Sequence, residues 1–447
     1  MPATPQNAGW SYEVRAGAAG ELLTVEGSFP AASGEDFGVD PEGASFVGQV
    51  FAYHDGRTDS VTRDGPRWSI PACRAGCGIR YEYRLGDAAR AIEDRGVAET
   101  HPQGVQAPPS TWLLRPLDAA AGTRLRFHVA SAPGDTFTTG VYPVPGSTDT
   151  FEAVTETGTL DVPYAAFGAL RRARLADGHV EVGVFPGTLH DEGVILSWVE
   201  RSARAVEDYY GRPPVSRVLV LIQPVAGDRV GFGSTMGSSG AAIAIAVGQD
   251  ATADSLRDDW VLIHEMIHTA LPNVDRSHHW LEEGLATYVE PIVRARAGLV
   301  ASPDVWREWL SGMPKGLPEP RDEGLDRTHT WGRTYWGGAL FCLEADIEIR
   351  ERTGNRRSLR DALRAIVANG GSIAVDWPVE RILDVGDAAT GVTVLRDIYR
   401  RMATRPEGVD LIRLWLALGV KDEQGDVVFD DDAPLASIRH AMLTTQQ

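Results

Sequence analysis

A short segment, His264-Glu265-Met266-Ile267-His268, has the residue types and the spacing of a hydrolytic metal site. If the segment is helical, the imidazoles of His264 and His268 project from one face about one turn apart. Two imidazoles placed in this way can bind one zinc ion, and a catalytic zinc needs a third protein ligand and an open position for water. We expect Glu265, beside the first ligand, to take a proton from the attacking water and to return it to the leaving group.

Glu283 is the predicted third ligand. It lies in residues 280–286, Trp-Leu-Glu-Glu-Gly-Leu-Ala, on an expected helix that can pack antiparallel to the first after an intervening turn. His278 and His279 stand closer to His268 in the sequence and could compete as ligands. Because both precede the bulk of the expected helix, we expect them to flank the site instead.

The composition is that of an ordinary globular protein, and the length suits two or three domains. The chain has 447 residues, of which 43% are hydrophobic, and its 43 Lys and Arg against 62 Asp and Glu give a net charge of −19. This charge opposes attraction to phosphate backbones, so we expect no nucleic-acid partner. The apolar runs fall far short of the roughly 20 residues that a membrane-spanning helix needs, so we expect no transmembrane segment.

The elements that must position these residues follow a change in hydrophobic pattern along the chain. Up to about residue 184, segments such as 79–85 and 125–129 alternate apolar and polar residues between turns rich in glycine and proline. Such alternation predicts half-buried strands, and little helical periodicity is seen before Asp191. We therefore expect an amino-terminal antiparallel β domain, a sandwich or a related all-β module, over residues 1–165.

Helices dominate the second half of the expected structure, giving a multidomain α+β class. A helix capped by Asp254 or Ser255 should carry the histidine pair and end near Leu271. The expected domains after the first are a central one at 166–300 and a helical region at 301–447 that completes the active site. The other expected elements are helices at 191–210, 279–296, 338–353, 358–369, 393–403 and 409–418, strands at 218–222 and 241–247, and a Gly/Ser-rich loop at 231–240.

Cysteine usage leaves the cellular compartment open. Cys73 and Cys77 stand in a turn-like stretch and could form a small disulfide, which favours a periplasmic or extracellular location over a cytoplasmic one, or could remain thiols. Cys342 lies in an apolar helical pattern and is expected in the core. Residues 1–7 lack the basic start and the apolar run of a signal peptide, and could equally be a mature terminus after processing.

The candidate ligands belong to a longer pattern that resembles a known enzyme family. Residues 264–268 and 280–286 are similar to the gluzincin metallopeptidases, in which HExxH precedes W-L-x-E-G-x-A. Residues 331–341 and 346–359 are similar to the glycyl aminopeptidase branch, with its Tyr-x-Lys-Gly-like segment and its D-x-x-I-R-x-x-T-x-G-x-x-S-L stretch. The wider aminopeptidase N family shares the first of these two features. Gly337 stands where that first pattern has lysine.

The resemblance implies a thermolysin-like zinc catalytic domain, one zinc ion per chain and a peptide or protein substrate. It also implies that Tyr335 donates a hydrogen bond to the oxyanion that forms at the scissile carbonyl. The alternative for Tyr335 is a packed aromatic residue among Trp331 and Trp336. The implied activity is hydrolysis of peptide bonds by an aminopeptidase.

One feature of such aminopeptidases is missing from residues 231–240. Aminopeptidases of this group carry an acidic residue there that binds the free amine of the substrate, whereas this segment contains no carboxylate. Backbone groups of Gly237, Ser238, Ser239 and Gly240 could instead pair with an extended substrate, an arrangement compatible with an endopeptidase.

Several interpretations therefore stay open. An aminopeptidase needs a carboxylate that faces the substrate amine, and Asp228 and Glu282 are the nearest candidates in the sequence. A zinc endopeptidase, or a zinc hydrolase acting on substrates other than peptides, would share every catalytic residue. A non-catalytic interaction protein on the same scaffold would normally have lost Glu265 or a metal ligand, and all of these are intact.

Overall fold

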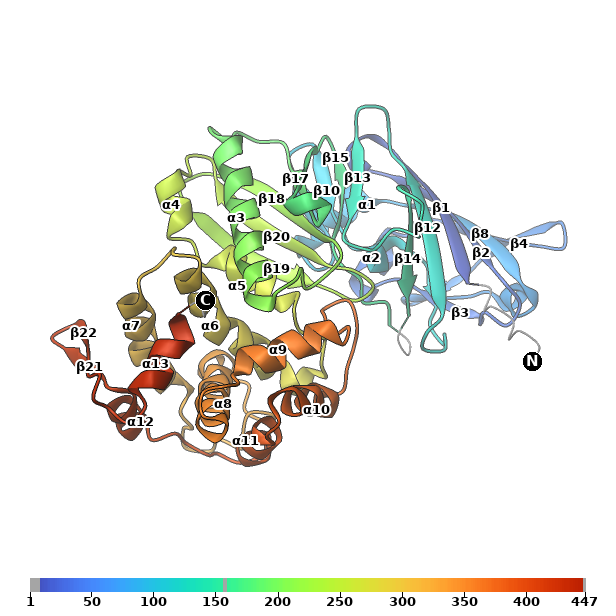
Figure 1. Cartoon of the computed structure of the whole chain (residues 1–447). Coiled ribbons are helices and arrows are strands. Elements are labelled where there is room, and N and C mark those ends of the chain that lie inside the picture. The colour runs from blue at the N-terminus through green and yellow to red at the C-terminus, as the bar shows by residue number, and fades with distance from the viewer. Residues whose placement is uncertain (1–8, 156–158, 445–447) are drawn as a thin grey trace. The chain divides into compact units, whose positions relative to one another are not determined.

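The computed structural model describes residues 9–155 and 159–444, and the chain divides into two compact units, whose elements are labelled in Figure 1. Unit 1 comprises residues 1–190 and 217–250, and unit 2 comprises residues 191–216 and 251–447. The predicted boundaries at residues 165 and 300 do not coincide with those of the units, and the division into three domains stays a prediction. Residues 1–7, in which a signal peptide was not expected, lie outside the described residues.

The largest sheet of unit 1 has seven strands in the order β14-β12-β1-β2-β8-β4-β5. In that order their bounds are Thr150–Val154, Arg124–Ala130, Trp10–Ala16, Leu23–Phe29, Cys77–Tyr83, Val50–His54 and Arg57–Val61. Buried and more exposed residues alternate along β8 and β12, which confirms the half-buried strands predicted near residues 79–85 and 125–129. The sheet departs from the predicted antiparallel arrangement at β1 and β12, which pair in parallel.

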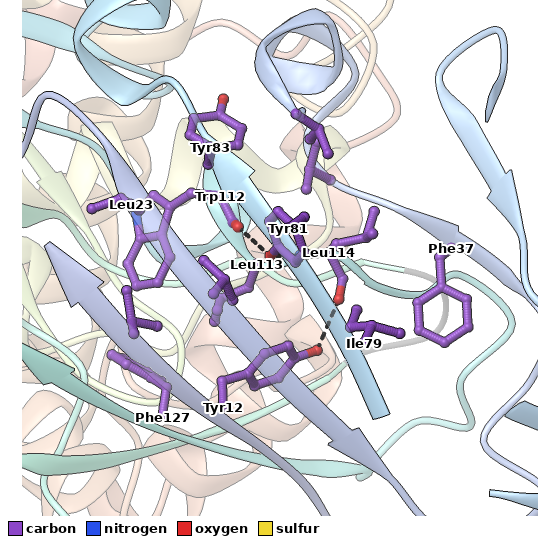
Figure 2. Packing of buried hydrophobic residues seen from close by; sticks show 14 of the residues in the cluster. Tyr12, Leu23, Phe37, Ile79, Tyr81, Tyr83, Trp112, Leu113, Leu114 and Phe127 are labelled. Carbon is purple, nitrogen blue, oxygen red and sulfur yellow. Dashed lines mark hydrogen bonds between the residues drawn. The ribbon is translucent and has the colours of Figure 1, made fainter. Parts of the chain in front are cut away.

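Aromatic and aliphatic side chains fill the core against this sheet (Figure 2). Tyr12 and Tyr81 lie in this core with their hydroxyls satisfied: they donate to the carbonyls of Leu114 at 3.2 Å and Trp112 at 2.7 Å. The Tyr81 hydroxyl also accepts a hydrogen bond from the Leu114 amide at 2.8 Å. A buried phenol stabilises a core only when its polar tip is bonded, so these bonds hold residues 112–114 against the sheet.

Two four-stranded sheets, two short helices and a disulfide complete this part of unit 1. The sheets have the orders β13-β15-β10-β9 and β11-β3-β7-β6. Their bounds in these orders are Thr136–Thr139, Ala165–Gly168, Gly104–Gln106, Glu99–His101, Arg115–Pro116, Asp36–Gly38, Arg67–Ser69 and Arg63–Asp64. Helices α1 (Leu85–Ile92) and α2 (Pro109–Trp112) were not predicted, because one or two turns show too little periodicity. Cys73 and Cys77 are joined by a disulfide, and Cys342 is buried as expected.

A five-stranded sheet in the order β16-β17-β18-β20-β19 also belongs to unit 1. The bounds are Arg171–Leu175, Val180–Val184, Val218–Val225, Ala242–Gly248 and Val230–Met236. Strands β18 and β20 confirm those predicted near residues 218–222 and 241–247. The loop predicted at 231–240 is wrong in its first part, because Val230–Met236 forms the edge strand β19, antiparallel to β20. Pairing with β20 overrides the low strand propensity of its glycines.

The helices of unit 2 begin with α3 (Glu192–Tyr210), which ends at Gly211 as predicted. The single helix predicted from residue 254 or 255 to 271 is instead two helices, α4 (Ala253–Arg257) and α5 (Val261–His268). Thr252 caps α4 in place of the predicted Asp254 or Ser255, and its hydroxyl accepts from the Ser255 amide. Helix α6 has the predicted bounds, His279–Arg296.

Four of the remaining helices have bounds close to those predicted, and three were not predicted. Helices α8, α9, α11 and α12 confirm those predicted beyond residue 338, and Ser358 caps α9 in a capping box with Asp361. Helices α7, α10 and α13 and the hairpin β21–β22 were not predicted. The bounds are Ser302–Gly312 (α7), Gly338–Thr353 (α8), Leu359–Ala368 (α9), Val379–Thr390 (α10), Val394–Met402 (α11), Leu411–Leu418 (α12), Val420–Glu423 (β21), Asp426–Phe429 (β22) and Ala436–Leu443 (α13). Within residues 9–155 and 159–444, none of the helices has both the length and the apolar character needed to cross a membrane.

Candidate functional site

Helix α5 carries both predicted histidine ligands. Asp259 starts this helix, because its carboxylate accepts hydrogen bonds from the backbone amides of Val261 at 3.1 Å and Leu262 at 3.2 Å. These bonds satisfy amides that have no partner within the helix. His264 and His268 follow four residues apart, with ring centroids 4.9 Å from each other. The local sequence thus places the two imidazoles together on a short helix.

Helix α6 brings Glu283 to the histidine pair. The Nε2 atoms of His264 and His268 lie 3.4 Å and 3.7 Å from the Oε2 atom of Glu283. The three potential ligand atoms all lie within 4.8 Å of one another. Tetrahedral nitrogen and oxygen ligands, each about 2.0–2.2 Å from a zinc ion, are separated by roughly 3.4 Å. The donor set and its spacing therefore fit a single zinc ion.

A pair of glycines lets α6 approach α8 closely. A Cβ atom added to Gly284 would lie 2.2 Å from the Cα atom of Gly338. A Cβ atom added to Gly338 would lie 2.1 Å from the carbonyl oxygen of Trp280. Any other residue at either position must separate the two backbones. Because Gly284 directly follows Glu283, this contact helps to set the position of the third candidate ligand.

The electrostatic surroundings favour the protonation states that a metal requires. Burial lowers the pKa of His268 to about 4, so its imidazole is neutral at neutral pH and offers a lone pair. Burial alone would raise the pKa of Glu283, but the hydrogen bond from His264 and the charges of the neighbouring histidines lower it to about 2. Neutral imidazoles and an ionised carboxylate are the forms that bind a metal ion.

His279 and Glu282 flank Glu283, as expected from their positions in the sequence. The Nδ1 atom of His279 lies 2.9 Å from the carboxylate of Glu282, and its Nε2 atom lies 3.5 Å from the Oε1 atom of Glu283. Glu282 also accepts a hydrogen bond from the backbone amide of Val274 at 3.4 Å. Among the described residues, the group that could hold a metal ion includes neither His278 nor His279.

Asp326, which the sequence analysis did not single out, holds the start of α6. Its Oδ1 atom lies 2.9 Å from Nδ1 of His278 and accepts from Nε1 of Trp280 at 2.8 Å. Its Oδ2 atom accepts from the hydroxyl of Tyr399 at 3.0 Å. Only the fold reveals this role, because Asp326 is far from these partners in the sequence and belongs to no recognised motif.

Glu265 and Tyr335 belong to the same unit as the candidate ligands. Glu265 is buried in α5, and Tyr335 lies in a π-helix, Gly332–Gly337, that leads into α8. Burial, then the charge and hydrogen bond of Glu283, and finally the charge of Glu265 raise the pKa of Tyr335 to about 12. The phenol therefore stays protonated at neutral pH and can donate a hydrogen bond. Such π-helical turns are frequent at functional sites.

A buried ion pair anchors this π-helix. Arg333 is 2% exposed, and its Nε atom lies 2.7 Å from the Oδ2 atom of Asp322. Its guanidinium also donates to the carbonyl of Gly316. The indole of Trp336 packs on Gly312, where a Cβ atom would lie 2.0 Å from the ring. These contacts restrict the turn on which Tyr335 lies.

The motif at residues 346–359 forms a buried network around one carboxylate. Asp346 accepts hydrogen bonds from the hydroxyl of Tyr288 at 3.0 Å, from Nε of Arg350 at 3.0 Å and from the amide of Leu359 at 2.8 Å. Tyr288 belongs to α6, and Leu359 begins α9. The motif thus ties α6, α8 and α9 together, and its contribution to the site is positional.

The predicted substrate-binding segment, residues 237–240, belongs to unit 1, whereas the candidate ligands, Glu265 and Tyr335 belong to unit 2. The carbonyl of Ser239 accepts from the amide of Tyr142 at 3.0 Å, and its hydroxyl accepts from the amide of Val154 at 2.9 Å. Part of this segment is therefore bonded within its own unit, and its contact with substrate stays a prediction. Asp228 also lies in unit 1, between β18 and β19.

Solved structures of M1 zinc metallopeptidases share the fold of this chain. An aminopeptidase N family protein from Idiomarina loihiensis matches with a TM-score of 0.69 and 12% identity, over 92% of this chain and 78% of that chain. An M1 zinc metallopeptidase from Deinococcus radiodurans matches with a TM-score of 0.54 and 14% identity, over 90% of this chain and 94% of that chain. A mutant of that metallopeptidase bound to a Tyr-Ser-Ala substrate has a TM-score of 0.53, 15% identity and the same coverage. Searches with protein-family models and among curated proteins gave no match. The fold is thus that of the family which the sequence resembles, in agreement with the predicted α+β class.

Proposed function

We propose that this protein is a zinc-dependent peptidase, and that it acts as an aminopeptidase. The observation that carries the proposal is the convergence of His264, His268 and Glu283 within 4.8 Å, on a fold shared with M1 zinc metallopeptidases. A zinc ion held by these three residues would polarise the scissile carbonyl and increase the acidity of a water molecule. One such ion per chain is the proposed cofactor.

Two further residues of unit 2 have the chemistry that peptide hydrolysis requires. Glu265, the residue after the first ligand, takes a proton from the attacking water and passes it to the leaving amine. Tyr335 donates a hydrogen bond to the carbonyl oxygen as negative charge develops on it. Its pKa of about 12 keeps that proton available at neutral pH. Interactions of His279 with Glu283 restrain the carboxylate, as partners of metal ligands commonly do.

An endopeptidase is the second candidate. The aminopeptidase assignment is supported by the similarity in fold to the aminopeptidase N family protein from Idiomarina loihiensis. The endopeptidase alternative is supported by the lack of any carboxylate in residues 231–240. It is also supported by the engagement of Glu282 with His279 and Val274, which reduces its suitability as an anchor for a substrate amine.

A pair of peptides tests the proposal. Purified protein is first analysed for zinc, and the expected content is one ion per chain, strongly reduced by Glu283→Ala and retained by the control Glu344→Ala on α8. The zinc-loaded protein is then incubated with a peptide and its N-acetylated twin. Cleavage of the free peptide alone supports an aminopeptidase, and equal cleavage of both supports an endopeptidase. Absence of zinc, or failure of the loaded protein to cleave any peptide in a diverse mixture, would overturn the proposal.

A further inference from the structure

Unit 2 contains a pocket of about 380 Å³ that is lined in part by the candidate ligand His264. Trp260, Trp331, Tyr335 and Trp336 form aromatic walls around it. Trp260 and Trp331 remain 50% and 60% exposed, although indoles are rarely left so open. Large exposed aromatic surface in a concave site is typical of a binding surface. Because His264 and Tyr335 line it, the pocket suits a substrate side chain that adjoins the scissile bond.

The buried end of the pocket holds two carboxyl groups and one guanidinium. Glu290 and Arg294 of α6 and Glu308 of α7 line it, and Glu290 pairs with Nη1 of Arg294 at 3.1 Å. Burial raises the pKa of Glu308 even though the charge of Arg294 opposes the shift. Burial, together with the charges of Glu308 and Asp259, raises the pKa of Glu290 to about 8 against the opposing effect of Arg294. One guanidinium thus serves two carboxyl groups of the pocket lining, and at neutral pH a further cation beside Glu290 would stabilise its ionised form.

Lys315, the second cation of the pocket, lies near two of the aromatic side chains. Lys315 is exposed, and its Nζ atom lies 5.8 Å from the ring centroid of Trp331 and 5.7 Å from that of Trp336. It is not among the charges that act on Glu290 or Glu308. The second carboxyl group at the buried end therefore has no cation of its own, and a cation from a ligand would stabilise its ionised form.

The geometry of α6 indicates what kind of cation fits. Glu283 and Glu290 are seven residues apart on this helix, which places their backbones about 10 Å apart along its axis. The amine of an amino-terminal residue lies next to the scissile carbonyl and cannot span that distance. A lysine or arginine side chain can, because it carries its charge at the end of a long flexible stem.

We propose that this pocket receives the side chain of a lysine or arginine that flanks the scissile bond of the peptide substrate. The apolar stem lies against the indoles of Trp260 and Trp331, and the cation lies among the carboxylates of the buried end. The inference rests on the proposed peptidase function and specifies its substrate class.

Peptides that contain lysine or norleucine at each of the two flanking positions provide the activity test. Norleucine keeps the stem and removes the charge. At one of the positions we expect kcat/KM to be about tenfold higher for lysine than for norleucine, as for a hydrogen-bonded charge. Glu308→Gln should reduce that ratio about tenfold. Glu344→Gln, which changes a partly buried carboxylate on α8 outside the pocket, should preserve it. A ratio of one or less in the unmodified protein at both positions would overturn the inference.

A binding measurement separates this inference from the proposed function. Indole fluorescence of the zinc-loaded protein is followed while lysine amide or norleucine amide is added. We expect lysine amide to bind about tenfold more tightly, and Glu308→Gln to remove most of the difference. Equal or tighter binding of norleucine amide would show that the pocket does not prefer a cationic side chain and would overturn the inference. If the protein cleaves no peptide, the proposed function fails, while the binding comparison still decides what the pocket accepts.

Discussion

The core beneath the seven-stranded sheet of unit 1 and the helices around the candidate site of unit 2 are stabilised by different kinds of buried polar contact. In the core beneath the seven-stranded sheet, buried polar side chains such as Tyr81 and Arg115 bond to backbone carbonyls. In unit 2, buried charges pair with each other, as Arg333 does with Asp322 and Arg350 with Asp346. Buried ion pairs add little net stability, but a structure that breaks one is strongly disfavoured. In unit 2 such pairs restrain the turn that carries Tyr335 and the helices packed beside it.

The largest expected effect is a loss of catalytic rate that leaves the stability of unit 2 unchanged. Glu265→Gln should lower kcat by at least about a thousandfold, because an amide of the same shape cannot accept the proton of the attacking water. Zinc content and melting temperature should stay unchanged. Steady-state kinetics, metal analysis and calorimetry of the same preparation test this, and substantial residual turnover would mean that another residue acts as the base.

The next effect concerns the buried pair that anchors the π-helix. Arg333→Met should reduce the free energy of unfolding by about 3–5 kcal/mol, because it leaves the carboxylate of Asp322 buried without its partner. The matched control is Arg307→Met, which removes an exposed pair with Asp304 on α7 and should cost less than about 1 kcal/mol. Denaturant titration measures both variants, and similar losses would contradict the contrast between buried and exposed pairs.

In unit 1, the buried imidazole of His101 should make the stability of the protein depend on pH. Burial, helped by the charge of Arg95, lowers the pKa of His101 to about 4, although Glu99 lies 3.5 Å from its Nε2 atom. The folded state therefore favours the neutral imidazole, which stacks on Phe185 with ring centroids 3.8 Å apart. Stability that is present above pH 6.5 should fall by up to about 3 kcal/mol between pH 6.5 and 4. The difference between unfolding curves of the unmodified protein and His101→Gln isolates this effect, and parallel curves would refute it.

The smallest expected effect falls on Tyr335. Tyr335→Phe should lower kcat by about a hundredfold with little change in KM, because the lost hydrogen bond forms mainly in the transition state. Trp331→Phe is a useful comparison, since it alters the ring that stacks on Tyr335 while leaving the hydroxyl in place. An unchanged kcat for Tyr335→Phe would assign Tyr335 to packing, the alternative left open by the sequence.

The local parts of the site were the predictable ones. The spacing of His264 and His268 follows from helix geometry alone, and the bounds of α6 follow from its apolar pattern. Tyr335 is distant in the sequence, and only the resemblance to a family singled it out. The proximity of Glu290 to Glu308 could not be predicted, because the two carboxyl groups belong to different helices. These relations are tertiary, and no local pattern encodes them.

The errors in the fold have equally specific causes. A period of two marks a strand without saying whether its neighbour runs parallel, so the pairing of β1 with β12 was missed. The glycines of β19 led to the prediction of a loop, although its partner β20 was predicted correctly. The break between α4 and α5 was missed because Asp259 can either continue a helix or start one, and here its carboxylate bonds the first amides of α5.

The contact between Gly284 and Gly338 has a consequence for the choice of metal ion. With no side chain between the two backbones, the backbone at Glu283 has no space to shift toward α8. Ca²⁺ needs about six to eight oxygen ligands at roughly 2.3–2.6 Å, a larger and more oxygen-rich shell than one carboxylate and two imidazoles supply. The ligand chemistry of this cluster therefore disfavours large, hard cations, while two residues that offer no ligand atom limit where the backbone of the third candidate ligand can lie.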